Sequence, residues 1–299
     1  MKQEEEKKWR DSGKLAAKVK SYARTLIKPE TPALEIAEKV EKKIESFKAK
    51  NAFPISIACN EIAAHSSPAY NDDLKINGVV KVDLGISIDG FISDTAFTVD
   101  LTPENKYKEL IKSSDEALKK AIKIIKPGIE LWQIGDVIQK TISGMGFAPI
   151  RNLMGHSLER YKIHAGISIP NYNNNNKLTL QEGQIIAVEP FSTTGEGIVQ
   201  DGKISDVYDL VEKKPVRDAA SRKMIDFIEK EYSTLPFAGR WLVKEFGKKA
   251  LFSLRMLEQA EALHHFPQLV EKTKHPVSHS EHTLLITKNG CDVLTEETE

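Results

Sequence analysis

Two runs rich in β-branched residues flank the dipeptide Asp89-Gly90 and predict a β-hairpin over residues 79–99. With a two-residue turn at that dipeptide, Asp83 pairs with Ala96 on the opposite strand. Because side chains alternate between the faces of a strand, Asp83 and Asp94 then point to the same side of the sheet. They become diagonal neighbours, roughly 7–8 Å apart at the backbone. In one straight strand their odd spacing would put them on opposite faces, so the hairpin is what brings the two carboxylates together.

This carboxylate pair is either a cation site or two solvated strand residues. Aspartate is depleted in strands and is costly to bury without a partner. Two divalent cations about 3.5–4 Å apart would fill the gap between such carboxylates. Asp83 and Asp94 are therefore interpreted as metal ligands, with solvated positions as the alternative.

Three further metal-binding side chains follow in the sequence, namely His156, Glu189 and Glu281. Glu189 ends the apolar run 185–188 and precedes a proline, which places it near a strand end. Glu281 opens the predicted strand 281–287, in which His282 faces the other way and is favoured as a structural histidine. His156 follows a glycine, and alone it could equally be an exposed loop residue. Four carboxylates and one imidazole together form the hard, oxygen-rich donor set that suits two divalent cations.

These residues and their neighbours resemble methionine aminopeptidase, of the type II branch found in archaea and in the eukaryotic cytosol. The likeness spans residues 52–283 in family order and rests on these segments: Ala52-Phe53-Pro54, Ala63-Ala64-His65-Ser66-Ser67-Pro68, Asp83-Leu84-Gly85, Asp94-Thr95-Ala96, Gly155-His156, Ile163-His164-Ala165-Gly166, Glu189-Pro190-Phe191 and Glu281-His282-Thr283. Prolidases and proline-specific aminopeptidases share the five ligands. The Ala-Ala-His element and the long insertion after Glu189 favour type II.

The resemblance implies an α+β pita-bread fold, with a duplicated core related by a pseudo-two-fold axis. It also implies a metalloprotease that removes the N-terminal methionine of nascent polypeptides when the second residue is small. Two divalent ions, Co, Mn, Fe or Zn, would serve as cofactors, and the water or hydroxide bridging them would attack the scissile carbonyl. The family is mostly monomeric, so a monomer is expected.

Roles for single residues are implied by position in the family motifs. Asp83 corresponds to a ligand of one metal, Asp94 and Glu281 correspond to bridging carboxylates, and His156 and Glu189 correspond to ligands of the other metal. Glu189 is also the expected proton acceptor. His65 and His164 are the expected catalytic and substrate-binding histidines. Phe53 and Phe266 are expected to form the walls of the methionine pocket. The sequence departs from the family at Ser278-His279-Ser280, where relatives often have a glutamine and an aromatic residue. This change is expected at the rim of the pocket.

Residues 196–275 interrupt the pattern with helical signals at 215–231, 236–247 and 249–262. The catalytic domain is accordingly expected to comprise residues 1–195 and 276–299, with 196–275 as an inserted helical subdomain. Helices are also predicted at 4–27, 32–47, 104–125 and 131–144. The insertion carries mixed charge and is interpreted as a wall or lid, which leaves an association with the ribosome open.

Charge and hydropathy bear on whether the protein binds DNA or membranes. The 299 residues carry 43 basic and 43 acidic side chains, so the formal net charge is zero and no direct DNA binding is expected. No apolar stretch approaches the ~20 residues of a membrane span, and the charged N-terminus has no signal-peptide core. A cytoplasmic protein that does not bind membranes is predicted.

Two alternatives to a methionine aminopeptidase remain at this point. A related enzyme that cleaves Xaa-Pro bonds would cut Ala-Pro and would show no preference for methionine. A non-catalytic pita-bread protein that binds RNA or ribosomes would be expected to lose metal ligands, whereas all five positions are retained here.

Overall fold

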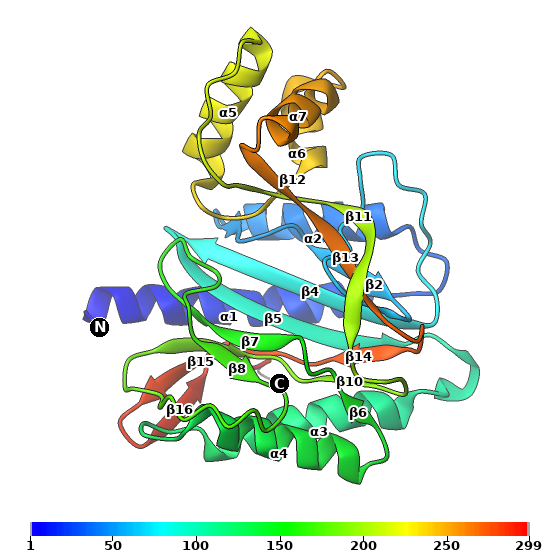
Figure 1. Ribbon diagram of the computed structural model, residues 1–299, viewed down its shortest axis with the longest axis vertical. Coiled ribbons are helices and arrows are strands. Elements are labelled where there is room, and N and C mark those ends of the chain that lie inside the picture. The colour runs from blue at the N-terminus through cyan, green and yellow to red at the C-terminus, as the bar shows by residue number, and fades with distance from the viewer. Residues whose placement is uncertain (1, 298–299) are drawn as a thin grey trace.

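The computed structural model describes residues 2–297 and shows two helix pairs, each packed on its own sheet, with a third lobe above them (Figure 1). The helices are α1 (Gln3–Leu26), α2 (Ala33–Ser46), α3 (Lys108–Ile124), α4 (Leu131–Gly144), α5 (Ala219–Tyr232), α6 (Gly239–Phe246) and α7 (Ala250–Gln259), with a 3₁₀ turn at Pro103–Asn105. All seven regions predicted to be helical contain a helix. Within residues 2–297, no helix is both long and apolar enough to cross a membrane.

The strands of the described residues form four sheets. The first contains β1 (Lys50–Asn51), β4 (Val79–Ile88), β2 (Ser56–Cys59) and β5 (Phe91–Asp100). The second contains β14 (Val277–His279), β10 (Phe191–Thr193) and β6 (Ala148–Pro149). The third contains β12 (Phe237–Ala238), β11 (Val199–Leu210), β13 (Leu263–Glu271) and β3 (Ile62–Ala64). The fourth contains β16 (Gly290–Val293), β15 (His282–Thr287), β9 (Ile185–Val188), β7 (Met154–Leu158) and β8 (Ser168–Pro170).

The predicted hairpin is present with its predicted register. Strands β4 and β5 pair antiparallel, with Asp83 opposite Ala96 and Gly85 opposite Asp94. Asp89 adopts a left-handed backbone at φ 51° and Gly90 one at φ 86°, as a two-residue turn of this kind requires. Asp83 and Asp94 therefore lie on one face as diagonal neighbours.

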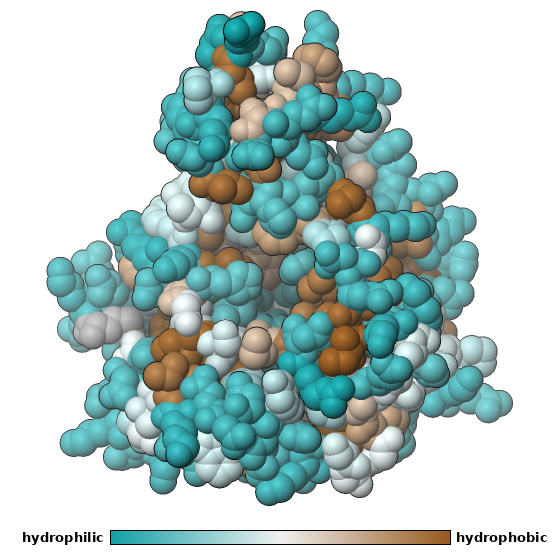
Figure 2. All heavy atoms as spheres, viewed as in Figure 1, coloured by the Kyte–Doolittle hydropathy of each residue, from teal (hydrophilic) through white to brown (hydrophobic). Residues whose placement is uncertain are grey.

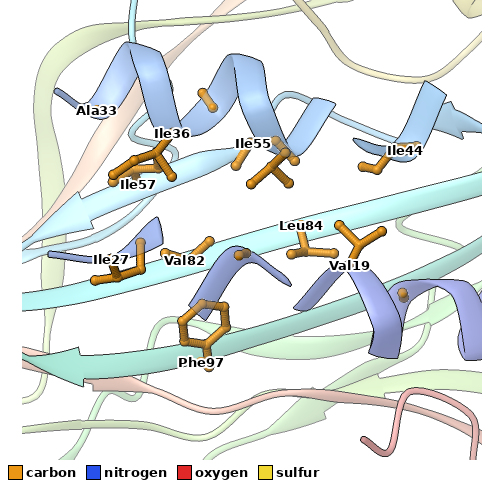
Figure 3. Close-up of a cluster of buried hydrophobic side chains, with 14 of the residues drawn as sticks. Val19, Ile27, Ala33, Ile36, Ile44, Ile55, Ile57, Val82, Leu84 and Phe97 are labelled. Atoms are coloured by element: carbon orange, nitrogen blue, oxygen red, sulfur yellow. The ribbon is translucent and has the colours of Figure 1, made fainter. Parts of the chain in front are cut away.

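The first half of the molecule buries the apolar faces of α1 and α2 against the first sheet. In Figure 3, Val19 of α1 and Ile36 of α2 point towards Val82 and Leu84 of β4. These four side chains have no solvent exposure. Apolar residues at helical spacing on two helices meet apolar residues at alternate positions of a strand, so the packing follows from the sequence pattern.

The second half repeats this plan. Helices α3 and α4 pack on the fourth sheet, where Ile134 and Ile138 of α4 lie in one cluster with Ile186 of β9 and Leu284 of β15. Each half thus consists of a helix pair covering the outer face of an antiparallel sheet, as Figure 1 shows for α3 and α4 below and α1 behind. This arrangement confirms the predicted duplication.

Hydrogen bonds join the two halves along β5 and β15. The hydroxyl of Thr283 donates to the carbonyl of Asp94 at 2.8 Å, and the Asp94 amide donates to the Thr283 hydroxyl at 2.7 Å. The Thr95 hydroxyl donates to the carbonyl of Glu281 at 2.9 Å. Because these bonds involve the residues expected to bind metal, the contact between the halves also fixes the ligand positions.

The predicted insertion, residues 196–275, contains the strands β11, β12 and β13 as well as helices, so the expected description as helical is incomplete. Strand β11 opens it and β13 closes it, and the two pair antiparallel. Most of the first half of β11 is exposed, so its sequence lacks the alternation that would predict a strand. Strand β13 also pairs with β3, with Leu269 opposite Ala64. The insertion is therefore tied into the body of the protein.

Arg240 at the start of α6 anchors the insertion. Its guanidinium is buried, forms an ion pair with Glu41 of α2, and donates to the Ser67 hydroxyl at 2.7 Å and the Pro68 carbonyl at 2.8 Å. Its backbone amide donates to Asp206 of β11 at 2.8 Å. One side chain thus connects the insertion, the first helix pair and the segment after His65.

We expect Arg240→Met to lower the free energy of unfolding by about 3–5 kcal/mol, because it leaves the buried Glu41 carboxylate without its cation. Chemical denaturation of the purified variant measures this loss. Lys213→Ala is the matched control, since it removes an exposed ion pair of the same insertion and should change stability little. Adding Glu41→Gln to Arg240→Met should restore part of the stability. Equal losses of stability in Arg240→Met and Lys213→Ala would contradict the role of Arg240 as the anchor of the insertion.

Candidate metal centre and substrate cavity

A cavity of about 590 Å³ lies between the two halves and the insertion. Figure 2 shows this face hollowed below the lobe that carries α5, α6 and α7. All nine side chains expected to bind metal, bind substrate or take part in catalysis line it: Phe53, His65, Asp83, Asp94, His156, His164, Glu189, Phe266 and Glu281. The sequence-based hypothesis therefore names residues that the fold brings to one place.

The backbone explains why the distant carboxylates converge. Val188 of β9 pairs with His282 of β15, so Glu189 at the end of one strand lies beside Glu281 at the start of the other. His156 on β7 pairs with Ala187 of β9 and faces the same cavity. Asp83 and Asp94 arrive from the hairpin across the contact between β5 and β15.

The side chains form two overlapping groups that share Glu281. Asp94, His156 and Glu281 make one group, and Asp83, His279 and Glu281 make the other. Within each group, one candidate ligand atom per residue lies within 4.8 Å of the others. The His156 Nε2 atom is 3.6 Å from an oxygen of Asp94 and from an oxygen of Glu189. These separations are too long for hydrogen bonds, but two atoms that each lie about 2.1 Å from a common ion can be this far apart.

Burial raises the pKa values of all four carboxyl groups. Burial raises the pKa of Asp83 to about 7. For Asp94, Glu189 and Glu281 burial raises the pKa well above the usual range, and the negative charges of neighbouring carboxylates raise it further. One oxygen of Asp83 and one of Asp94 are buried and have no hydrogen-bond partner within residues 2–297. Divalent cations fit this donor set, because they would stabilise the ionised form of every member.

His279 was expected at the rim of the pocket and instead lies beneath the carboxylates. Its side chain is almost completely buried, and its Nε2 atom is 3.7 Å from one oxygen of Glu189 and one of Glu281. Burial lowers its pKa to about 3, and burial likewise lowers the pKa of His156 to about 3, so both imidazoles are neutral. The spacing between His279 and Glu281 could have revealed this position, because alternate residues of an extended segment share a face.

His65 lies outside the carboxylate cluster, at the end of β3. Its backbone is left-handed at φ 58°, an uncommon conformation for a residue other than glycine that typically costs about 1–3 kcal/mol. Burial lowers the pKa of its imidazole to about 4, and its Nδ1 atom has no hydrogen-bond partner in the part of the chain that the structure describes. A strained, neutral imidazole that lines a cavity is available to bind another molecule.

Aromatic side chains form an apolar wall beside the polar cluster. The Phe266 ring of β13 lies edge-on to His65, with centroids 5.4 Å apart. The Phe53 ring lies against Gly85, where a Cβ atom would approach within 2.1 Å of the ring. A side chain at position 85 would therefore displace Phe53, which explains the glycine. His164, exposed at the cavity, lies edge-on to His156 at 4.4 Å.

The chain belongs to metallopeptidase family M24, whose sequence pattern matches residues 7–231. Within that family it groups with the methionine aminopeptidases. It is 43% identical to "Methionine aminopeptidase" of the archaeon Methanocaldococcus jannaschii over 96% of this chain and 97% of that protein. This likeness agrees with the type II branch expected from the motifs.

Solved structures confirm the pita-bread fold. The methionine aminopeptidase of Thermotoga maritima superposes with a TM-score of 0.73 at 26% identity, over 99% of this chain and 98% of that one. A thermophilic Arx1 superposes with a TM-score of 0.85 over 98% of this chain and 91% of that one, but at 17% identity this likeness shows the fold alone.

We expect metal binding to the apoprotein to release protons near neutral pH. The raised carboxyl pKa values mean that the folded apoprotein holds protons that free carboxylates would have lost, and cations require the ionised form. Apparent affinity should rise between about pH 6 and 8, around the Asp83 pKa of about 7, by about tenfold per pH unit for each proton released.

Calorimetric titration with Co²⁺ in two buffers of different ionisation enthalpy counts the released protons. An identical heat in both buffers would mean that no proton is released and that the carboxylates are ionised before the cation binds.

Proposed function

We propose that this cavity binds the N-terminal methionine of a polypeptide and releases it by hydrolysis, with two divalent cations held by Asp83, Asp94, His156, Glu189 and Glu281. The observation that carries the proposal is the pair of overlapping ligand groups that share Glu281, placed beside an apolar wall in one cavity. Co, Mn, Fe and Zn all accept carboxylate and imidazole ligands.

When bound, the cations would lower the pKa of a water molecule and polarise the scissile carbonyl. Glu189 is assigned as the proton acceptor, since it lines the cavity at the edge of the cluster and retains some exposure. It would take the proton of the attacking water and pass it to the leaving amine. Two imidazoles face the cavity from outside the cluster, the exposed His164 and the half-buried His65. We assign His164 to the developing oxyanion and His65 to the substrate backbone.

The aromatic wall supports a methionine side chain as the specific occupant. Phe53 and Phe266 line the cavity on its apolar side, and a thioether packs favourably against aromatic rings. A free α-amine would lie near the carboxylates, which explains cleavage from the chain end. We propose that residues 1–195 and 276–299 form the catalytic domain and that residues 196–275 are inserted into it. Because Phe266 belongs to the insertion, the insertion helps to form the methionine pocket.

The cellular context is proposed from this activity. Newly synthesised chains carry the N-terminal methionine, so we place the activity in the cytoplasm and take nascent polypeptides with a small second residue as substrates. We also predict that the protein is a monomer and that the insertion contacts the ribosome.

Release of free methionine from two peptides tests the proposal. We expect EDTA-treated protein resupplied with Co²⁺ or Mn²⁺ to cleave Met-Ala-Ser well and Met-Leu-Ser poorly, because the proposed activity requires a small second residue. Chromatography of the products measures both rates. Cleavage of Ala-Pro in place of both peptides would move the assignment to the proline-specific relatives, and the absence of all cleavage would favour a non-catalytic binding protein.

We expect His65→Asn to lower turnover by about 10²-fold, because misplacing a bound substrate by about 1 Å typically costs this much. Asparagine is chosen because it accepts a left-handed backbone more readily than alanine does. Metal stoichiometry should not change, since His65 belongs to neither ligand group.

Steady-state kinetics and metal analysis of the same preparation separate the two effects. His264→Ala is the matched control, because this histidine also contacts Phe266 but is exposed and does not line the cavity. Near-normal turnover in His65→Asn, or a comparable loss in the control, would remove His65 from the proposed reaction.

A further inference from the structure

His279 is held rigidly behind the cluster. It ends β14, where it pairs with Phe191, and its ring stacks on the Phe191 ring with centroids 3.9 Å apart and planes inclined by 14°. The Thr98 hydroxyl donates to the His279 carbonyl at 2.7 Å, and the His279 amide donates to that hydroxyl at 2.8 Å. Backbone and ring are both fixed, so the direction of Nε2 is set by the fold.

The Nε2 atom lacks any hydrogen-bond partner among residues 2–297, although it is buried. A buried polar atom without a partner has lost its hydration with nothing in exchange, which destabilises the protein. The nearest acceptors, Glu189 and Glu281, are at 3.7 Å, beyond hydrogen-bonding range. A cation placed between His279 Nε2 and these carboxylate oxygens would be coordinated by the lone pair of the imidazole and by both carboxylates.

We propose that His279 is an additional ligand of the ion held by Asp83 and Glu281. The inference rests on the proposed two-ion function and deepens it. The candidate ligand atoms of Asp83, His279 and Glu281 lie within 4.8 Å of one another, the same limit that describes Asp94, His156 and Glu281. Each ion then has one imidazole of its own, and Glu281 belongs to both groups.

A second imidazole changes which metals the centre favours. Carboxylates alone suit Mn²⁺ and Mg²⁺, whereas imidazole suits Zn, Fe and related ions, and affinity for nitrogen-containing sites rises from Mn²⁺ towards Co²⁺. With His279 at the ion of Asp83, both positions should prefer Co²⁺ or Fe²⁺ to Mn²⁺. Substitution of His279 should reduce that preference at one position only.

Proton NMR of the Co²⁺-loaded protein tests ligation without measuring activity. A histidine bound to Co²⁺ gives a strongly shifted, solvent-exchangeable ring N–H resonance. We expect two such resonances in the unsubstituted protein, from His156 and His279, and one in His279→Gln. Calorimetry of the variant should show weaker binding of one of the two ions by at least about tenfold, because even groups that only orient ligands typically contribute about 10–100-fold.

His282→Gln is the matched control. His282 neighbours Glu281 but bonds to Thr295 at 2.8 Å, and it belongs to neither ligand group. Both resonances and both affinities should persist in this variant. A single shifted N–H resonance in the unsubstituted protein, or two that persist in His279→Gln, would overturn the assignment even if that variant binds metal more weakly. Failure of the apoprotein to bind two ions would contradict the proposed function itself, so the two failures are distinguishable.

Discussion

The two halves of the molecule meet where four buried carboxyl groups lie close together, and this cluster is the main constraint on the structure. Asp83 and Asp94 come from one half, and Glu189 and Glu281 come from the other. Burial raises the pKa of all four groups, and neighbouring carboxylates raise those of Asp94, Glu189 and Glu281 further, so bound cations would stabilise the ionised form of the cluster. The ligands reach one another only because the two halves meet at this cluster.

The contact between β5 and β15 fixes the relative positions of these ligands. Thr95 and Thr283 bond to the backbone of Glu281 and Asp94, so hydroxyl groups hold the ligand-bearing strands together through the main chain. The carboxylates themselves remain free to face the cavity. This division of roles lets the fold tolerate the repulsion, because the main-chain bonds do not depend on the ionisation of the side chains.

Local chemistry determined which parts of this site could be predicted from the sequence. The Asp89-Gly90 turn fixes the register of the hairpin, so the proximity of Asp83 and Asp94 followed from residues close in the chain. The convergence of Glu189 and Glu281 depends on strand pairing across more than ninety residues, which no local pattern encodes; here family motifs supplied the answer. Strand β11 escaped prediction because its exposed, charged residues hide the alternation. His279 was placed at the rim, although its spacing from Glu281 indicated a shared face.

The insertion contributes to the cavity as well as to its surroundings. Strand β13 carries Phe266 and pairs with β3, whose end leads directly into the left-handed backbone of His65. Arg240 bonds to Ser67 and Pro68 just beyond that histidine and anchors them to Glu41. A strained backbone persists only where its surroundings hold it, and here the supports on both sides come from the insertion. The same segment therefore supplies a wall of the proposed methionine pocket and fixes the conformation of the imidazole beside it.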